Sequence, residues 1–254
     1  HDPRERTTHG LTLSMLATDE SAPLNTFEAT WPLVEPVGGW LTREQARVIH
    51  DAVLALPPGS TVVEVGSHQG RSTLTAALAR PDVTVVAIDP FRAGGKFGGP
   101  TTREVFEANL RRAEVRDRVD HVAETSADVR RDWRRPVDLV FVDGKHDVWS
   151  TRADLRWAAY LPAGRRILVH DSFGSVGVTL ALLLFVLPSR SLRYAGRVGS
   201  LATFVRARPT ARDRRALLAQ LPWFVRNVGI KALLRLRLRP LARLAGHRDA
   251  ADPY

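Results

Sequence analysis

Apolar positions in this chain fall into short runs that alternate with segments of helical period. Short apolar runs bounded by turn residues are typical of buried strands, whereas apolar residues three and four apart indicate helices. The runs predict strands over 61–65, 83–88, 119–122, 137–142 and 166–170. The intervening segments predict helices over 41–56, 71–79, 101–115, 127–133, 149–160 and 176–185. This alternation predicts an α/β fold with a mostly parallel sheet and helices on both faces.

Two further strands are expected over 192–198 and 201–205, separated only by Gly199 and Ser200. A connection this short makes a hairpin, so one of the two strands must run antiparallel. The expected fold is therefore a Rossmann-like, doubly wound, seven-stranded sheet that ends in an antiparallel hairpin and carries helical appendages.

Three parts are expected along the chain. Residues 1–40 have little periodicity and should cap the domain, with Trp31 and Trp40 available to pack there. Residues 41–206 form the main domain, and 207–254 form a basic helical appendage broken at Pro222 and Pro240.

Two helix starts carry capping signals. Thr42 is placed to cap the helix over 41–56, and the pattern Thr-Thr-Arg-Glu at 101–104 predicts the start of the helix over 101–115.

The chain contains no cysteine, which excludes disulfides, thiolate metal sites and cysteine nucleophiles. Its longest apolar run, 176–187, is shorter than the roughly 20 residues that span a bilayer. No secretory signal pattern is evident, so we expect a cytoplasmic protein.

Positive charge is concentrated near the C-terminus. The net charge is +10, yet residues 189–254 contain 15 Arg and Lys against 3 Asp and Glu, which leaves 22 basic and 24 acidic residues elsewhere. One interpretation is a solvated basic surface; the other is an anionic partner, such as a membrane surface, nucleic acid or an acidic polymer. Nucleic acid is the less expected partner because no aromatic stacking platform or nucleic-acid motif is evident. A membrane-surface contact here would make the protein membrane-associated.

Residues 234–239 alternate Leu and Arg like a strand, although their flanks favour a helix.

A glycine-rich turn, Gly66-Ser67-His68-Gln69-Gly70, joins the first strand to the next helix. Glycine allows a sharp turn and a close approach to a ligand, and a helix N-terminus offers N–H donors to a carboxylate. Asp89 ends the second strand. The chain resembles class I S-adenosylmethionine (SAM)-dependent methyltransferases in this series of features.

The cofactor roles follow from that placement. The candidate residues of the turn are Gly66, Ser67, Gly70 and Ser72, whose donors suit the methionine carboxylate of SAM. Glu64 would accept from the amino group of SAM, and Asp89 would bind the ribose hydroxyls. Glu124 or Ser126, after the third strand, would hydrogen-bond the adenine, the alternative being an ordinary helix cap.

The glycine spacing differs from the G-x-G-x-x-G pattern of dinucleotide sites, because only G-x-x-x-G is present. A nucleotide-binding-like domain without SAM remains the structural alternative.

Aspartates also end two later strands, in Val142-Asp143-Gly144-Lys145-His146 and in Val169-His170-Asp171. Ligands bind at the carboxyl ends of such strands. Asp143 and Asp171, with His170 as a possible third ligand, would hold Mg²⁺ or another divalent cation, and Asp143 would also contact SAM. The alternative is that these aspartates only cap the following helices.

Methyl transfer to a hydroxyl requires removal of its proton and alignment of its oxygen with the methyl group. A metal can lower the pKa of the hydroxyl, and His146 is suited to take the proton. The alternatives are an exposed loop histidine for His146, and a ligand, a supporting partner or a packing residue for His170.

The motifs Val-Asp-Gly-Lys-His and Leu-Val-His-Asp-Ser resemble those of metal-dependent sugar O-methyltransferases of the macrocin and mycinamicin types. They also resemble enzymes that methylate mannose in bacterial polysaccharides. The similarity covers about residues 60–206 and implies that Asp143 binds the metal and that His146 is the base. The relatives' second motif can hold two adjacent acidic ligands, whereas here the first of these positions is His170.

The resemblance implies a Mg²⁺-dependent SAM O-methyltransferase acting on a saccharide hydroxyl, in an oligosaccharide, a polysaccharide or a glycosylated natural product. A catechol-like or other small-molecule acceptor is the main alternative, and a nucleic-acid methyltransferase is less favoured. We expect a homo-oligomer, in the form of a dimer. The glycine-rich residues 91–100 are a candidate lid over the site.

Overall fold

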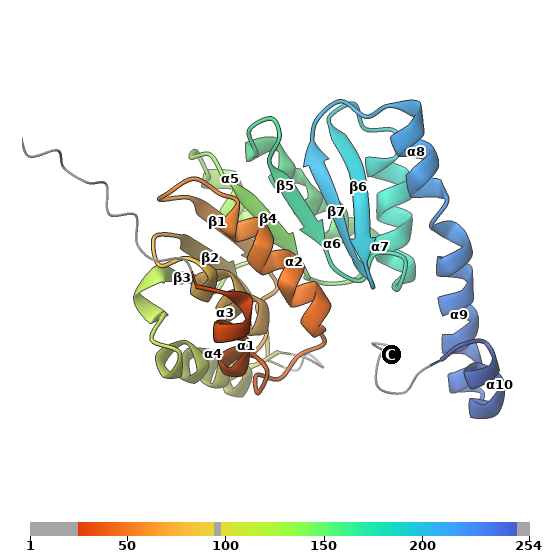
Figure 1. The fold of residues 1–254 in the computed structure, drawn as a ribbon, viewed down its shortest axis with the longest axis horizontal. Coiled ribbons are helices and arrows are strands. Elements are labelled where there is room, and N and C mark those ends of the chain that lie inside the picture. The colour runs from red at the N-terminus through yellow and green to blue at the C-terminus, as the bar shows by residue number, and fades with distance from the viewer. Residues whose placement is uncertain (1–24, 94–97, 248–254) are drawn as a thin grey trace, which may run out of the picture.

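A single seven-stranded sheet organises the protein (Figure 1). The structure is a computed structural model that describes residues 25–93 and 98–247. The strand order is β3-β2-β1-β4-β5-β7-β6, in which β7 runs antiparallel to both β5 and β6 and the other neighbours are parallel. The strands are β1 Thr61–Val65, β2 Thr84–Ile88, β3 Val119–Val122, β4 Leu139–Val142, β5 Arg166–Val169, β6 Leu192–Val198 and β7 Leu201–Arg206. The predicted fold class is confirmed, with each strand within two residues of its expected bounds.

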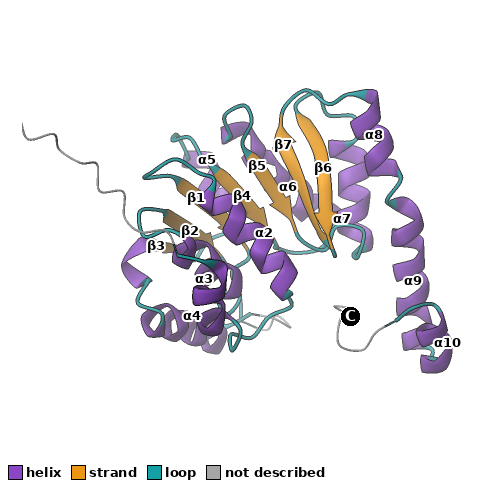
Figure 2. Cartoon of the chain, in the orientation of Figure 1, coloured by secondary structure: helices purple, strands orange, loops and turns teal. Residues whose placement is uncertain are grey.

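Helices cover both faces of the sheet (Figure 2). One apolar cluster joins the sheet to α1 Phe27–Val34, α2 Arg43–Leu54, α3 Arg71–Ala79 and α4 Pro100–Arg112. The other cluster lies on the opposite face, with α5 Ser126–Asp132, α6 Val148–Leu155 and α7 Val176–Ala181. Neighbouring residues of a strand contribute to opposite clusters, as Val62 and Val63 do, because side chains alternate along a strand. Both faces of the central strands are therefore buried.

Three short helical segments accompany these helices in the described part of the chain. Residues Arg116–Arg118 and Arg156–Tyr160 form 3₁₀ turns, and Leu182–Val186 extends α7 as a π-helix. The helices expected over 149–160 and 176–185 are therefore each divided in two.

The N-terminal region contains a helix, α1, that the sequence did not indicate. Trp31 of this helix is buried in the core, as expected, but Trp40 is 52% exposed. Thr42 caps α2 as expected, in a capping box with Gln45. The predicted cap at 101–104 is wrong: α4 begins with Pro100, and its N-cap, Gly99, makes no side-chain hydrogen bond. Proline suits the first helical turn because its missing N–H has no partner there.

The C-terminal part forms three helices, α8 Ala211–Leu218, α9 Leu221–Arg235 and α10 Arg239–Leu244. Pro222 and Pro240 do not break helices as expected; each lies in the first turn of one. The alternating segment 234–239 spans the end of α9 and the start of α10, so the strand interpretation is wrong.

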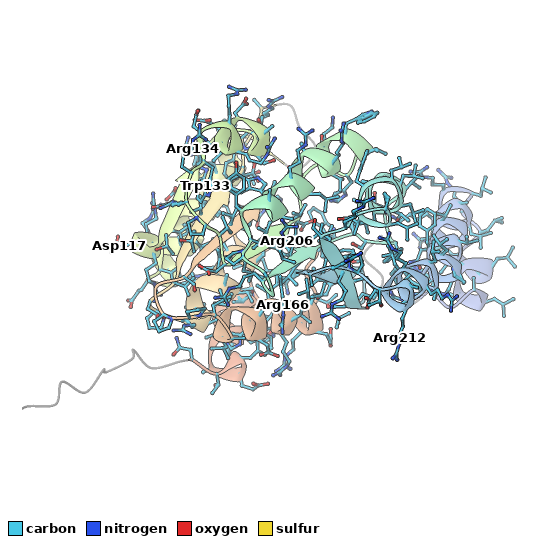
Figure 3. All side chains as sticks on the ribbon, turned by 90° about the horizontal axis from the view of Figure 1, so that it is seen from above. Asp117, Trp133, Arg134, Arg166, Arg206 and Arg212 are labelled. Carbon is cyan, nitrogen blue, oxygen red and sulfur yellow. The ribbon has the colours of Figure 1, made fainter. Side chains whose placement is uncertain are left out.

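Packing joins this part to the sheet. Helix α8 packs against β6, and the Arg197 guanidinium lies 3.9 Å from the centre of the Trp223 ring. Arg212 of α8 points away from the body of the protein (Figure 3). Among the described residues, no helix has both the length and the apolar character needed to cross a bilayer.

Candidate active site

The glycine-rich turn lies between the end of β1 and the start of α3, and its geometry requires glycine at two positions. Gly66 has φ +86° and Gly70 has φ +92°, a region that residues with a side chain rarely adopt. A Cβ atom on Gly66 would overlap the carbonyl oxygen of Asp143, and one on Gly70 would lie 3.1 Å from the Phe106 ring. The turn therefore contacts the backbone of Asp143 directly.

Asp89 holds this turn in place. Its Oδ2 accepts hydrogen bonds from the backbone N–H groups of Ser67 and His68, each at 3.0 Å, and its Oδ1 accepts from Phe91 N at 2.9 Å. The carboxylate thus has a structural role that the sequence did not reveal. Its role toward a ribose stays a prediction.

Glu64 lies in β1, immediately behind the turn, and is almost fully buried. Burial raises the pKa of Glu64 to about 7, although hydroxyls including those of Ser72 and Thr73 partly offset this effect. Thr73 donates a hydrogen bond to Glu64 Oε2. A carboxyl group poised near neutrality at this position is suited to pair with a ligand ammonium group.

The other candidate cofactor residues have mixed surroundings. Ser67 and Ser72 are buried at the turn, whereas Glu124 is exposed. Ser126 is buried, and its hydroxyl donates to Asp154 Oδ1. The cap of α5 is Thr125, so the helix-cap alternative applies to that residue and not to Ser126.

Strand register brings the acidic residues together. Val142 of β4 pairs with Val169 of β5, which places Asp143 beside His170 just beyond the strand ends. His146 Nε2 lies 3.5 Å from Asp143 Oδ1 and 3.2 Å from Asp171 Oδ2. Ligand atoms of Asp143, His146 and Asp171 all lie within 4.8 Å of one another, a spacing that a single metal ion can bridge. The chemistry of this set, two carboxylates and an imidazole, fits a divalent cation.

Neither aspartate caps a helix. The cap of α6 is Asp147, whose Oδ1 accepts from Trp149 N at 3.0 Å and Ser150 N at 2.9 Å. The N-cap of α7 is Ser175. The carboxylates of Asp143 and Asp171 are therefore not used by the following helices.

His170 is buried, and both of its ring nitrogens lie within hydrogen-bonding distance of other side chains. Nδ1 lies 3.1 Å from Asp143 Oδ1, and Nε2 lies 3.1 Å from Gln45 Oε1. The same Gln45 oxygen accepts from Thr42 N, and Gln45 Nε2 donates to Ser200 Oγ, so the amide orientation is fixed and His170 Nε2 must donate. This geometry favours a positioning role for His170 over the ligand role expected from the sequence.

Charges are strongly coupled in this cluster. Burial alone would lower the pKa of His170, but the carboxylates of Asp143 and Asp171 raise it well above its usual range. Burial alone would raise the pKa of Asp143, but His170 and His146 lower it. Burial likewise opposes the charged form of His146, yet the two aspartates raise its pKa. The described atoms therefore favour an imidazolium at His170 facing an ionised Asp143.

Several residues of the site gave no signal in the sequence. Gln45 was missed because its capping-box pattern does not reveal that the same amide also holds His170. Asp154 is buried, lines the same small cavity as Asp143, and has its pKa raised by burial to about 6.

Helix α9 holds the loop that follows Asp171. Asn227 Nδ2 donates to Phe173 O at 3.1 Å, and Lys231 Nζ donates to Gly174 O at 2.7 Å. Asp171 and Phe173 have φ of +54° and +58°, so this loop is strained, and the bonds from α9 stabilise it. Of the candidate lid, residues 94–97 lie outside the described residues, and the lid stays a prediction.

Comparisons with known proteins bear on the fold and on residues 63–172. Residues 63–172 match a family described as "Methyltransferase domain", a span that contains every candidate site residue expected from the sequence. Cofactor-bound Rv0187 from MTB is 21% identical with a TM-score of 0.55, covering 77% of this chain and 93% of that chain. An O-methyltransferase from Bacillus cereus, in complex with SAH, is 18% identical with a TM-score of 0.51, covering 75% and 93%. A protein from Corynebacterium glutamicum is 16% identical with a TM-score of 0.57, covering 78% and 94%.

At these identities the solved structures establish the fold, and the family match covers the glycine turn and both acidic strand ends. The chain therefore has the Rossmann-like fold of class I methyltransferases, and its residues 63–172 are similar to the methyltransferase-domain family.

Proposed function

We propose that this protein is a SAM-dependent O-methyltransferase that uses a divalent cation, Mg²⁺ in particular, and methylates a saccharide hydroxyl. One observation carries the proposal: the glycine turn and the acidic cluster are in contact, since Gly66 packs against the backbone of Asp143. A methyl donor seated on the turn would thus be next to the carboxylates that hold and activate an acceptor.

The turn suits SAM through the chemistry of its residues. The N-terminus of α3 supplies N–H groups to the carboxylate of the methionine part. Glu64, whose pKa lies near 7, would be ionised beside the ammonium group of SAM and accept its hydrogen bonds. Asp89 would bind the ribose through lone pairs that the turn does not use.

Asp143 and Asp171 would hold the cation. Carboxylate oxygens are the ligands that Mg²⁺ prefers in proteins. Lewis acidity from the cation lowers the pKa of an alcohol, and SAM supplies the methyl group. His170, held by Gln45, keeps the Asp143 carboxylate oriented.

His146 would take the proton of the acceptor hydroxyl. It is 44% exposed, so its ring can be reached from solvent, and it lies between the two aspartates. We assign it the role of base rather than of third ligand because the aspartates on either side stabilise the imidazolium that forms when it accepts the proton.

The saccharide acceptor rests on the resemblance of the Asp143 and Asp171 motifs to sugar O-methyltransferases. The exposure of His146 agrees with a bulky acceptor. A catechol-like acceptor would use the same cation and base, so the acceptor class must come from experiment.

The test is a screen of mannose oligosaccharides, glycosylated natural products and catechols with SAM, read by mass spectrometry as the gain of one methyl group. We expect a saccharide product with Mg²⁺ and none with EDTA. Activity that is insensitive to EDTA would overturn the cation role, and methylation of catechols alone would overturn the saccharide assignment. Lys145→Gln, a change in the exposed neighbour of His146, is the control that should retain activity.

A further inference from the structure

Helix α9 presents an apolar stripe to solvent. Val225, Val228, Gly229, Ala232 and Leu236 follow helical spacing and are all exposed, with Val225 at 66% and Leu236 at 68%. The opposite side of the helix is buried, through Asn227 and Ile230. The stripe is thus a continuous face of one helix, not a set of scattered residues.

Helix α10 and the turn before it extend this stripe. Leu238, Leu241 and Leu244 are exposed, and Leu244 reaches 86%. Both helices lie at the side of the protein beyond β6, away from the centre of the sheet (Figure 1). We call the exposed side chains of Val225, Val228, Leu236, Leu238, Leu241 and Leu244 the α9–α10 surface. Exposed apolar groups gathered in this way mark an interaction site.

The charged side chains within the segment that forms this surface, residues 214–247, have one sign. Residues 214–247 contain seven Arg and one Lys and no Asp or Glu. Arg235, Arg237 and Arg239 are exposed among the leucines of the stripe. Exposed apolar side chains interspersed with arginines are the pattern of a helix that lies in the interface of an anionic membrane.

We propose that the α9–α10 surface docks onto an anionic phospholipid bilayer, with its leucines and valines in the acyl boundary and its arginines among the headgroups. This binding goes beyond the methyl-transfer function and does not depend on it.

The same features argue against other occupants. A second copy of the chain, docked symmetrically through this surface, would bring arginines against arginines. Nucleic acid would use the cations but leave the leucines in water, and Trp223 and Phe224 pack against the core rather than forming a stacking platform.

Helix α9 links the proposed lipid surface to the loop that follows Asp171. The inner side of α9 donates the bonds from Asn227 and Lys231 to the loop after Asp171. The same helix therefore carries part of the proposed lipid surface on its outer side and bonds the loop after Asp171 on its inner side.

The test is flotation of the full chain with phosphatidylcholine vesicles, with and without phosphatidylglycerol. We expect binding only to the anionic vesicles, weakening with salt. Arg235→Gln with Arg239→Gln should weaken binding about tenfold or more, because each cation near such a surface contributes independently. Leu241→Ser with Leu244→Ser should weaken it similarly.

The matched controls are Arg111→Gln with Arg112→Gln, which remove the same charge from exposed positions on α4, and Leu33→Ser, on α1; both should bind like wild type.

Circular dichroism and thermal melting must show that each variant folds. Failure to bind anionic vesicles at low salt would overturn the proposal, as would equal binding by the α9–α10 variants and their controls. Sedimentation is measured in parallel without lipid. Self-association that the leucine changes abolish, without vesicle binding, would assign the surface to a second copy. Salt-sensitive RNA binding without vesicle binding would assign it to nucleic acid. Either result would overturn the lipid assignment.

Discussion

His170 Nε2 lies 3.1 Å from Gln45 Oε1, which ties the end of β5, where Asp171 follows, to a helix 125 residues earlier in the chain. Gln45 also contacts Ser200, at the turn of the β6–β7 hairpin. The orientation of Asp143 therefore depends on three separate parts of the fold. This explains how a buried histidine can act on the site through Asp143 without itself binding the cation.

Gln45→Leu should destabilise the protein and weaken the cation site. Loss of the amide leaves His170 Nε2–H buried without an acceptor, which costs about 1–3 kcal/mol in the free energy of unfolding. Urea denaturation measures this loss, and Glu44→Leu, an exposed neighbour, should change stability little. SAM affinity should stay near wild type; a large loss would mean that Gln45 acts on the glycine turn instead.

SAM affinity should depend on pH through Glu64. The ionised form binds the ammonium group of SAM, and the pKa of Glu64 is raised by burial to about 7. Below that pH the carboxyl must lose a proton to bind, so the dissociation constant should rise by up to about tenfold per pH unit. Calorimetry between about pH 5 and pH 7, below the range of about 7.7–8.0 in which an α-amino group titrates, measures this. Glu64→Gln should bind SAM weakly with no such dependence, and a pH-independent wild type would contradict the role.

The same shift affects stability in the absence of ligand. Because the pKa of Glu64 in the folded state is above the usual 4.5, the protonated group favours folding at low pH. This contribution is present below about pH 4.5 and is lost as pH rises through about 7. In urea titrations, the difference in stability between wild type and Glu64→Gln should therefore shift against the wild type over that range.

Gly66→Ala should damage the fold and the site far more than Gly59→Ala. Both glycines have positive φ, +86° and +70°, so both variants pay a backbone cost of about 1–2 kcal/mol. Only at Gly66 would the added methyl overlap the backbone of Asp143. Thermal melting and SAM titration should separate the two, and equal effects would mean that the turn and Asp143 do not touch in solution.

Asn227→Ala should loosen the loop after Asp171. The change leaves Phe173 O without its donor and should cost about 1–3 kcal/mol. Val228→Ala, the exposed next residue on α9, is the stability control. Cation affinity should fall in Asn227→Ala while SAM affinity is retained, because the loop carries Asp171 and not the turn. If the cation affinity of Asn227→Ala were unchanged, the bonds from α9 would have no influence on the proposed cation site.

The fold could be predicted from the sequence because its signals are local. Apolar runs such as 61–65 and the Gly199-Ser200 connection each specify an element or a turn without reference to distant residues. Asp143 and Asp171 could likewise be placed together, because parallel strands bring their carboxyl ends to one edge.

What the sequence did not reveal arises from contacts across the fold. His170 was a candidate ligand until its two nitrogens were found against Asp143 and Gln45, partners on different elements. Asn227 and Lys231 lie in a segment that reads only as a basic helix, and nothing local shows that they bond the loop near Asp171. Asp89 was predicted to bind the ribose. Its hydrogen bonds to the backbone of the glycine turn could not be predicted, because they depend on the conformation of that turn and not on the spacing of residues.

The account depends most on Asp143 and Asp171 holding one divalent cation beside the glycine turn. Mn²⁺ binding followed by electron paramagnetic resonance, in the presence of SAH, tests this without knowledge of the acceptor. We predict one ion bound per chain, with binding lost in Asp143→Asn and in Asp171→Asn while both variants still bind SAH. Absence of a bound ion in the wild type, or binding of the ion by either variant as tightly as by the wild type, would contradict the claim.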